Sequence, residues 1–395
     1  MKKSLFLLLG LTLLAATAFG AEELSSSPPF APLSPKIWGQ GGGYTSIAEG
    51  YEALFTNPAG FALETGKKGR SLTILSANPW FYGRPDYLLP FAYELTQGAD
   101  LASSASLISD QITTGGFGLG CSAGIGYVGK GLGLGFISTL DSYLYGQKIL
   151  GAEGEVLATF AFIGGLAVPL KLGKFDILIG GDVRPMLRIY SPLDNASVLS
   201  LLSALISDES IFSVLNQQTS YSGIALAIDA GMLIKLGGFS LGISARDLLG
   251  TKFQYNTGTF EEDFGGLLRA EIPEGGAIEA TAITPTNLSV GLSYRPPLDS
   301  IRWLIDPVIS VEAQDILGVF QDRQTFWTLL HAGIDMKLLS FFNIRGGISQ
   351  GYFTFGGGFK LFVLDINAAV FTREMGQYAG DRPNSGVTVE AAIRL

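Results

Sequence analysis

Short segments in which apolar side chains alternate with small or polar ones recur along almost the whole chain. From Phe117 to Tyr127 every odd position carries a larger, mostly apolar side chain, and the positions between are glycine or serine. The same period of two runs from Ile224 to Leu236, where Asp229 and Lys235 fall on the second face. Successive side chains of a strand point to opposite faces of the sheet. The pattern therefore predicts strands with one apolar face and one small or polar face.

An apolar chain without membrane helices limits how these strands can assemble. Charged residues make up 15% of the sequence and the mean hydropathy is +0.34, against about 25% charged residues in ordinary soluble domains. The uncharged run Gln111–Gly129, which no other run past residue 20 exceeds in length, holds seven glycines and is a poor helix. Only helices and closed barrels satisfy the backbone inside lipid. We therefore predict an all-β fold, a transmembrane antiparallel β-barrel. A soluble β-sandwich also alternates, but its exposed face would be richer in Lys, Glu and Thr.

About fourteen strands are predicted, an even number that places both chain ends on the periplasmic side. They cover residues 69–80, 116–129, 131–146, 155–169, 173–187, 221–236, 238–248, 285–296, 302–314, 326–338, 341–349, 351–363, 364–373 and 385–395. Tight turns, such as Lys130-Gly131 and Leu339-Ser340, alternate with long connections, as in bacterial barrels. The long connections are 81–115, 188–220, 249–284 and 374–384.

Two of the long connections carry helical spacing. Residues 98–112 and the apolar positions between Val198 and Leu215 fit one face of a helix. We therefore expect helical outer loops above the barrel. Such helices either form an apolar landing surface for a ligand or pack on one another, and the sequence leaves both open.

The first 68 residues precede the predicted barrel, which covers residues 69–395. Lys2 and Lys3, the apolar run Ser4–Ala16 and the small residues before Ala21 predict a cleaved signal peptide at 1–20, and hence export. Residues 21–68 have weak strand character and contain Asn57-Pro58-Ala59-Gly60. The Asn-Pro pair predicts a turn, because proline fixes φ and asparagine can bond its own backbone. Such a segment is either a periplasmic tail or a plug inside the lumen.

Asn57-Pro58-Ala59-Gly60, preceded by Glu52 and Ala53 just ahead of the first strand, resembles the FadL-type long-chain fatty acid transporter family. The predicted strand number and a helical third outer loop agree with that family. The resemblance implies that residues 21–68 form an N-terminal hatch in the lumen and that the outer loops capture a hydrophobic ligand. It also implies that the ligand leaves sideways through a kink in the third strand.

The third predicted strand contains a candidate for that kink. Glycines Gly133 and Gly135 alternate with larger residues, and the alternation blurs from Ile137 to Asp141. Broken alternation beside glycines is typical of a bulge or a kink. We therefore predict a strand kink at Gly133, Gly135 and Ile137, which the resemblance implies to be the lateral opening.

Catalytic and metal-binding patterns are missing from the sequence. His331 is the only histidine and falls on the inward face with Asp335 and Lys337, which favours a polar lumen residue over a Ser-His hydrolase. Cys121 is the only cysteine, so no disulfide forms within the chain. No cluster has metal-ligand spacing, and no glycine-rich run continues into a phosphate loop. We predict no enzyme activity, no catalytic residues, no metal and no cofactor.

The resemblance implies transport of hydrophobic compounds across the cell outer membrane, with long-chain fatty acids as the expected substrate and gated passive diffusion as the expected mechanism. A secretion-associated or partner-binding barrel without transport is the alternative, and a polar porin would need an unplugged lumen. The expected partners are outer-membrane lipids, the hydrophobic ligand and the barrel-assembly machinery. The net charge of −9 argues against nucleic acid.

Overall fold

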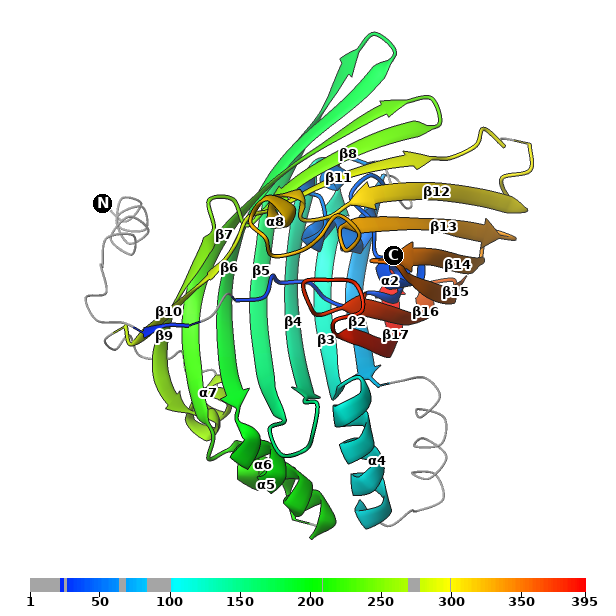
Figure 1. Cartoon of the computed structure of the whole chain (residues 1–395). Helices are drawn as coiled ribbons and strands as arrows, with labels where there is room; N and C mark the ends of the chain where they lie inside the picture. Colours follow the sequence, from blue (N-terminus) through cyan, green and yellow to red (C-terminus); the bar gives the residue numbers. More distant parts are fainter. Residues whose placement is uncertain are drawn as a thin grey trace, which may run out of the picture.

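The computed structural model of the chain describes residues 22–24, 27–63, 69–83, 101–207, 209–268, 278–298 and 300–395. The predicted signal peptide and parts of two outer connections lie outside these ranges. Most of the described residues belong to one continuous sheet (Figure 1).

Fourteen of the seventeen strands in the described residues form a closed antiparallel ring. The first strand, β2, pairs with the last, β17, and β8 pairs with β11, so every strand of the ring has two neighbours. This ring confirms the predicted barrel. Its strands are β2 (Arg70–Tyr82), β3 (Phe117–Gly129), β4 (Leu132–Tyr145), β5 (Glu153–Leu172), β6 (Phe175–Leu193), β7 (Thr219–Leu236), β8 (Phe239–Arg246), β11 (Asn287–Tyr294), β12 (Ile305–Ala313), β13 (Leu330–Leu338), β14 (Phe342–Ser349), β15 (Tyr352–Leu361), β16 (Leu364–Glu374) and β17 (Pro383–Arg394).

The connection expected at 249–284 contains two strands instead of only an outer loop. β9 (Thr251–Thr259) pairs with the first part of β7, and β10 (Ala280–Thr284) pairs with β9. Together they continue the wall beyond β8 and β11 toward the end of the barrel that carries the long connections. The prediction missed them because a four-residue interruption at 247–250 separates β8 from β9.

The two faces of the ring differ as the alternation requires. Leu119 and Ile125 on β3 are 55% and 51% exposed, whereas Ser122 between them is buried. Arg184, Asp229 and Glu390 are also buried, on the inward face. A charge facing lipid near the bilayer midplane would cost about 2–4 kcal/mol. The register of the strands therefore gives the barrel an apolar outer surface and a small or charged inner one.

The two ends of the barrel are also different. At one end the strands join through tight turns, where residues such as Lys130, Gly131, Leu339 and Ser340 have positive φ. At the other end lie the helices of the long connections (Figure 1), namely α4 (Leu101–Thr114), α5 (Asn195–Ile206), α6 (Ile211–Leu215) and α7 (Phe260–Leu268). One further helix, α8 (Ile316–Phe320), follows β12. Within the described ranges, no helix combines the length and the apolarity needed to cross a bilayer.

The helices of the long connections pack on one another and on the wall. Ile112 of α4, Val198 and Leu202 of α5 and Phe260 of α7 are buried together with Val156 of β5. The carboxylate of Asp194 accepts a hydrogen bond from the Ser197 amide at 2.8 Å and caps α5. These contacts support the packing interpretation of the outer helices, but Ile206 and Phe212 stay 58% and 67% exposed.

Candidate functional site

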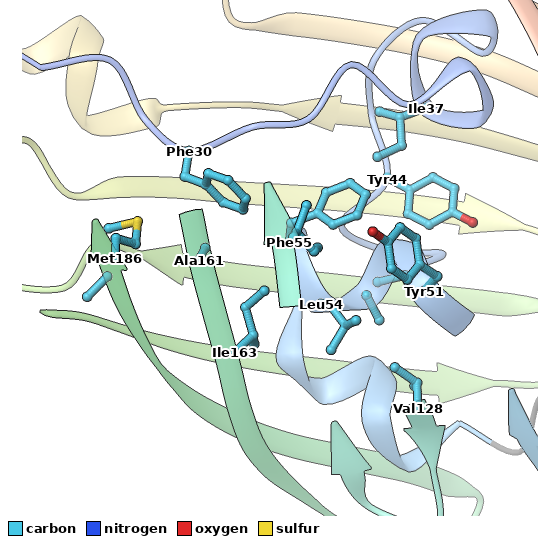
Figure 2. Packing of buried hydrophobic residues seen from close by; sticks show 14 of the residues in the cluster. Phe30, Ile37, Tyr44, Tyr51, Leu54, Phe55, Val128, Ala161, Ile163 and Met186 are labelled. Atoms are coloured by element: carbon cyan, nitrogen blue, oxygen red, sulfur yellow. The ribbon is translucent and has the colours of Figure 1, made fainter. Parts of the chain in front are cut away.

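Residues 27–63, here called the inner segment, lie against the inward face of the strands. They contain α2 (Pro35–Gly39) and the 3-10 helices η1 (Gly50–Phe55) and η2 (Pro58–Ala62), preceded by the two-residue strand β1 (Glu22–Glu23). Figure 2 shows Phe30, Leu54 and Phe55 of the inner segment packed beside Ile163 and Met186 of the wall. Leu54 is 1% exposed. The lumen is therefore filled by the chain's own N-terminal residues.

Glycines on the inward face leave the room that the inner segment occupies. A Cβ atom built on Gly133 would lie 2.6 Å from the Phe61 ring, and one on Gly135 would lie 2.7 Å from Leu54. At Gly347 a Cβ would lie 2.6 Å from the carbonyl carbon of Gln40. The small residues of the inward face thus leave room that a segment of the same chain fills.

The pairing of β4 is regular where a kink was expected. β4 pairs residue for residue with β3 and with β5 through Gly133, Gly135 and Ile137, with no register shift. The two glycines instead face Phe61 and Leu54, and Ile137 is fully buried among apolar residues of the inner segment and the wall. Glycine here serves close packing, a reason for strand glycines that sequence alone does not separate from bending.

Asn57 holds the turn of the Asn57-Pro58-Ala59-Gly60 motif against the wall. Its side-chain oxygen accepts a hydrogen bond from the Ala59 amide at 3.1 Å, which caps η2. Its amide group donates to the Thr45 carbonyl at 2.9 Å and lies within 3.4 Å of the Met232 carbonyl on β7. Asn57 is fully buried, so each polar atom of the side chain needs these partners.

A buried cluster of charges joins the inner segment to the end of the last strand. The Arg394 guanidinium lies 3.0 Å from Glu52 and 2.6 Å from Asp365. Lys36 of α2 lies 3.0 Å from Asp365 and 3.5 Å from Glu52. Burial alone would raise the pKa of Glu52, but Lys36 and Arg394 reverse the effect and lower its pKa. Glu52 is thus a carboxylate held by two cations.

His331 and Ser349 face each other but do not form a catalytic pair. The Oγ atom of Ser349 lies 3.2 Å from Nδ1 of His331, and the same nitrogen lies 2.7 Å from the Gly41 carbonyl oxygen. A carbonyl oxygen can only accept, so Nδ1 carries the proton and cannot take one from serine. Both side chains are also buried under the inner segment. The pair anchors Gly41 rather than activating a nucleophile.

Aromatic side chains line the lumen toward the end that carries the long connections. Tyr190 and Tyr221 are stacked with ring centroids 6.3 Å apart, and Tyr221 meets Tyr255 edge to face at 6.4 Å. Tyr255 then stacks on Phe253 at 5.7 Å. These four rings come from β6, β7 and β9 and form one continuous surface. We call the space beside them the aromatic chamber.

A small cavity of about 40 Å³ lies in the aromatic chamber, next to the start of the inner segment. Rings, aliphatic side chains and one carboxylate surround it: Leu24, Ser27, Pro28, Glu155, Leu157, Tyr190, Tyr255 and Ala282. Three of these residues belong to the N-terminal part of the chain. Leu24, Ser27 and Pro28 thus close one side of the cavity.

Arg188 connects that part of the chain to the chamber wall. Its guanidinium donates to the Ser27 hydroxyl and to the Pro28 carbonyl at 3.0 Å, and it lies over the Phe253 ring at 4.2 Å. Its Nε donates to the Thr159 hydroxyl at 3.1 Å. Arg188 is 1% exposed, and in the part of the chain that the structure describes no carboxylate forms an ion pair with it. A buried cation is thus held by neutral acceptors.

The wall of the barrel is interrupted beside the chamber, between β8 and β9. Residues Asp247 and Leu249 have positive φ, and Leu249 is 100% exposed. Ion pairs with neighbouring strands stabilise the interruption, because Arg184 lies 2.9 Å from both Asp229 and Asp247. The Asp247 amide donates to Asp229 at 2.7 Å. These side chains fix the conformation of the residues between β8 and β9, where the strand ladder is interrupted.

Sequence reasoning missed the chamber residues for two reasons. Phe253 and Tyr255 alternate with polar residues between Thr251 and Thr257, a strand signal that was available but lay within a presumed loop. Arg188 and Asp247 contact partners that are distant in the sequence, and no local sequence pattern predicts such contacts.

The remaining reactive side chains to consider are the cysteine and the possible metal ligands. Cys121 is a free, exposed thiol on the outward face of β3. No group of three or more His, Cys, Asp or Glu side chains within the described ranges could hold a metal ion.

No family model matches the chain, and no curated protein matches it. Solved structures similar to it include the toluene transporter TodX of Pseudomonas putida, at 12% identity over 95% of this chain and 98% of that chain, with a TM-score of 0.46. Another is the toluene transporter TbuX of Ralstonia pickettii, at 12% identity over 92% and 98% of the two chains, with a TM-score of 0.49. A FadL homologue of Pseudomonas aeruginosa is 13% identical over 92% and 98%, with a TM-score of 0.45.

Proposed function

We propose that the chain is an outer-membrane channel through which hydrophobic compounds move by passive diffusion, and that the inner segment closes it. The apolar outer surface of the ring fits a bilayer, since every backbone group of a closed barrel is paired within the wall. The signal peptide that the sequence predicts and the tight turns at one end of the barrel support an outer-membrane location.

The aromatic chamber is the observation that carries the proposal. A polar porin needs a lumen lined by groups that hold water, whereas the rings of Tyr190, Tyr221, Tyr255 and Phe253 present a continuous apolar surface. Ligand sites are mostly apolar with a few placed polar groups. The chamber combines rings with placed polar groups, namely the Glu155 carboxylate beside the cavity and the buried Arg188 guanidinium next to Ser27 and Pro28.

The buried cation of Arg188 favours a substrate that has an acidic group at one end. Burying a cation without a carboxylate is costly, and a ligand carboxylate would remove that cost by a bidentate contact. Long-chain fatty acids combine such a headgroup with a tail that suits the rings. The substrate we propose is therefore a long-chain fatty acid rather than a neutral hydrocarbon.

The exposed apolar residues of the outer helices would supply the first contact. Ile206 belongs to α5 and Phe212 to α6, and both helices lie at the end of the barrel that carries the long connections (Figure 1). A hydrophobic molecule arriving from outside would lower its free energy there before it reaches the rings, since apolar burial contributes about 25 cal/mol per Å².

The test compares labelled oleate with labelled oleyl alcohol, which share a tail and differ in the headgroup. Cells that lack their own uptake system for these compounds would express either the parent protein or Arg188→Met. We expect the parent to increase uptake of both compounds, and Arg188→Met to reduce oleate uptake by about tenfold while oleyl alcohol changes little. Arg188→Lys, which keeps the charge, should recover part of the oleate uptake.

Three outcomes separate the alternatives. Parent protein that increases uptake of neither compound contradicts the channel and favours a partner-binding barrel. Equal loss of both compounds in Arg188→Met contradicts the headgroup role and leaves the channel standing. Uptake of small polar solutes by the parent would instead indicate a porin.

A further inference from the structure

A second group of inward side chains lies on β2, β4 and β17 and at the end of β16, where these strands approach the long connections (Figure 1). Three tyrosines, two arginines and one asparagine form this group, here called the outer cluster: Tyr82, Tyr143, Tyr145, Arg373, Arg382 and Asn384. The tyrosine rings form a row, because Tyr82 meets Tyr143 edge to face at 5.7 Å and Tyr143 stacks on Tyr145 at 5.6 Å. The outer cluster shares no residue with the aromatic chamber, whose rings belong to β6, β7 and β9.

An arginine covers each end of this row of rings. The Arg373 guanidinium lies 4.8 Å from the centroid of the Tyr82 ring, and the Arg382 guanidinium lies 4.3 Å from the centroid of the Tyr145 ring. A guanidinium that covers an aromatic face is attracted to the ring, while its N–H groups still point outward within its own plane. The rings therefore position two cations and leave donors on both of them for another partner.

The carboxylates near the two arginines are bound by other groups. Asp141 accepts hydrogen bonds from an indole nitrogen at 2.9 Å and from a tyrosine hydroxyl at 3.0 Å. Glu374 accepts one from a tyrosine hydroxyl and three from backbone amides of residues 376–382, at 2.6 to 2.8 Å. Among the described residues, neither Arg373 nor Arg382 forms an ion pair. The positive charge of the outer cluster is thus not neutralised by a direct partner.

Asn384 adds unused hydrogen-bonding groups to the two cations. It is the register partner of Arg373, and Arg382 precedes it by two residues, so the three side chains share the inward face. Asn384 is fully buried, yet neither its Oδ1 nor its Nδ2 atom has a partner, and the Nε atoms of both arginines are buried without one. Such groups destabilise a fold unless a ligand satisfies them. The outer cluster therefore offers three nitrogen donors and one oxygen acceptor.

We propose that the outer cluster is a binding site for free phosphate in its monohydrogen form. The phosphate oxygens accept hydrogen bonds from the Arg373 and Arg382 guanidinium groups and from the Asn384 amide, since planar guanidinium groups suit phosphate geometry. The remaining P–OH group donates to Oδ1 of Asn384, the acceptor of the set. The inference goes beyond the proposed function and does not depend on it, because none of these residues lines the aromatic chamber.

The single acceptor selects phosphate over other anions. Sulfate and carboxylates carry no hydroxyl hydrogen at neutral pH, so they would leave Oδ1 of Asn384 unpaired. A phosphomonoester loses its P–OH proton with a pKa of about 6, whereas free phosphate still carries one hydroxyl at pH 7.5. We therefore expect free phosphate to bind more tightly than either sulfate or a phosphomonoester.

Isothermal titration calorimetry of the full-length protein in detergent tests the site. Inorganic phosphate, sulfate and glycerol 3-phosphate are the probes, each at pH 7.5, and heat-dependent gel mobility verifies that every variant is a folded barrel. We expect phosphate to bind about tenfold more tightly than the other two anions, and Arg373→Met or Arg382→Met to weaken it by about tenfold. Lys148→Met removes an exposed cation from the neighbouring connection and should bind phosphate as the parent does.

Asn384→Leu separates recognition of the ligand from a role in the fold. It removes both unpaired groups and keeps a similar size, so the melting temperature should stay unchanged or rise. The preference for phosphate over sulfate should fall to about one, because the acceptor for the P–OH group is gone. Absence of saturable phosphate binding by the parent, or an unchanged preference in Asn384→Leu, would overturn the proposal. Tighter binding of glycerol 3-phosphate than of phosphate would also overturn it.

Discussion

Gly133 and Gly164 lie on neighbouring strands but face opposite sides of the wall. A Cβ atom at Gly133 would lie 2.6 Å from the Phe61 ring, whereas one at Gly164 would have its nearest neighbour, Phe162, at 3.6 Å. The inward glycine is required by the inner segment and the outward one is not. Substitutions at the two positions therefore distinguish an effect on closure of the lumen from an effect on the stability of the wall.

We predict that Gly133→Val displaces Phe61 and weakens the hold on the inner segment, while Gly164→Val is tolerated. Overpacking of this kind typically costs about 1–3 kcal/mol, which the removal of η2 from its seat would relieve. Planar-bilayer recordings should show frequent open events for Gly133→Val and few for Gly164→Val or the parent. Equal open probability in all three proteins would show that Phe61 does not seal the lumen.

At the same scale, sequence predicts the turn at Asn57 but not what it holds. The bond from the Ala59 amide to Asn57 is local and follows from the side-chain chemistry of an Asn-Pro pair. The donation from Asn57 to the Thr45 carbonyl depends on how the inner segment folds back inside the barrel. Contacts that depend on how the chain folds back, such as this one, can be identified only from the three-dimensional structure.

At the scale of elements, the alternation locates the strands of the ring because each strand contacts lipid on one side along its whole length. The pattern fails where the wall is irregular. Between β8 and β9 the residues of 247–250 leave the ladder, and their geometry depends on Arg184 and Asp229 of other strands. On β4 the glycines that led us to expect a kink pack against the inner segment, and the sequence alone does not separate these two uses of glycine.

The inner segment should respond to acid through Glu52. Its pKa is lowered because Lys36 and Arg394 favour the carboxylate against the effect of burial. A lowered folded pKa means that Glu52 stabilises the closed state fully above its ordinary pKa of about 4.3 and that this stabilisation is lost as the pH falls through the lowered value.

We therefore predict more frequent channel opening as the pH falls through the lowered pKa of Glu52, because protonated Glu52 no longer pairs with the two cations. Glu52→Gln should open more often than the parent at pH 7 and should have a shallower pH dependence. Glu261→Gln, at an exposed position of α7, is the matched control and should behave as the parent does. A parent-like pH profile in Glu52→Gln would assign the acid response to another group.

At the scale of the whole molecule, the barrel and the inner segment are stabilised by different means. The ring closes through main-chain pairs between neighbouring strands, from β17–β2 around to β8–β11, and none of these pairs involves residues 27–63. The inner segment instead depends on side chains: the Asn57 amide, the Glu52 cluster, and the bonds from Thr45 to Glu312 at 2.7 and 2.8 Å. Closure of the lumen can thus be lost while the wall persists.

Deletion of residues 44–62 tests that separation. The deletion removes η1, η2 and Thr45, and it exposes Arg394 and Glu312 to water in the opened lumen, which hydrates both charges. We predict that the variant inserts as a folded barrel, passes steady ionic current, and admits polar antibiotics that the parent excludes. Oleate uptake should lose its dependence on Arg188, because a wide water-filled lumen no longer forces the headgroup past that side chain. A folded deletion variant that remains closed to ions would show that the strands and outer helices, and not the inner segment, seal the channel.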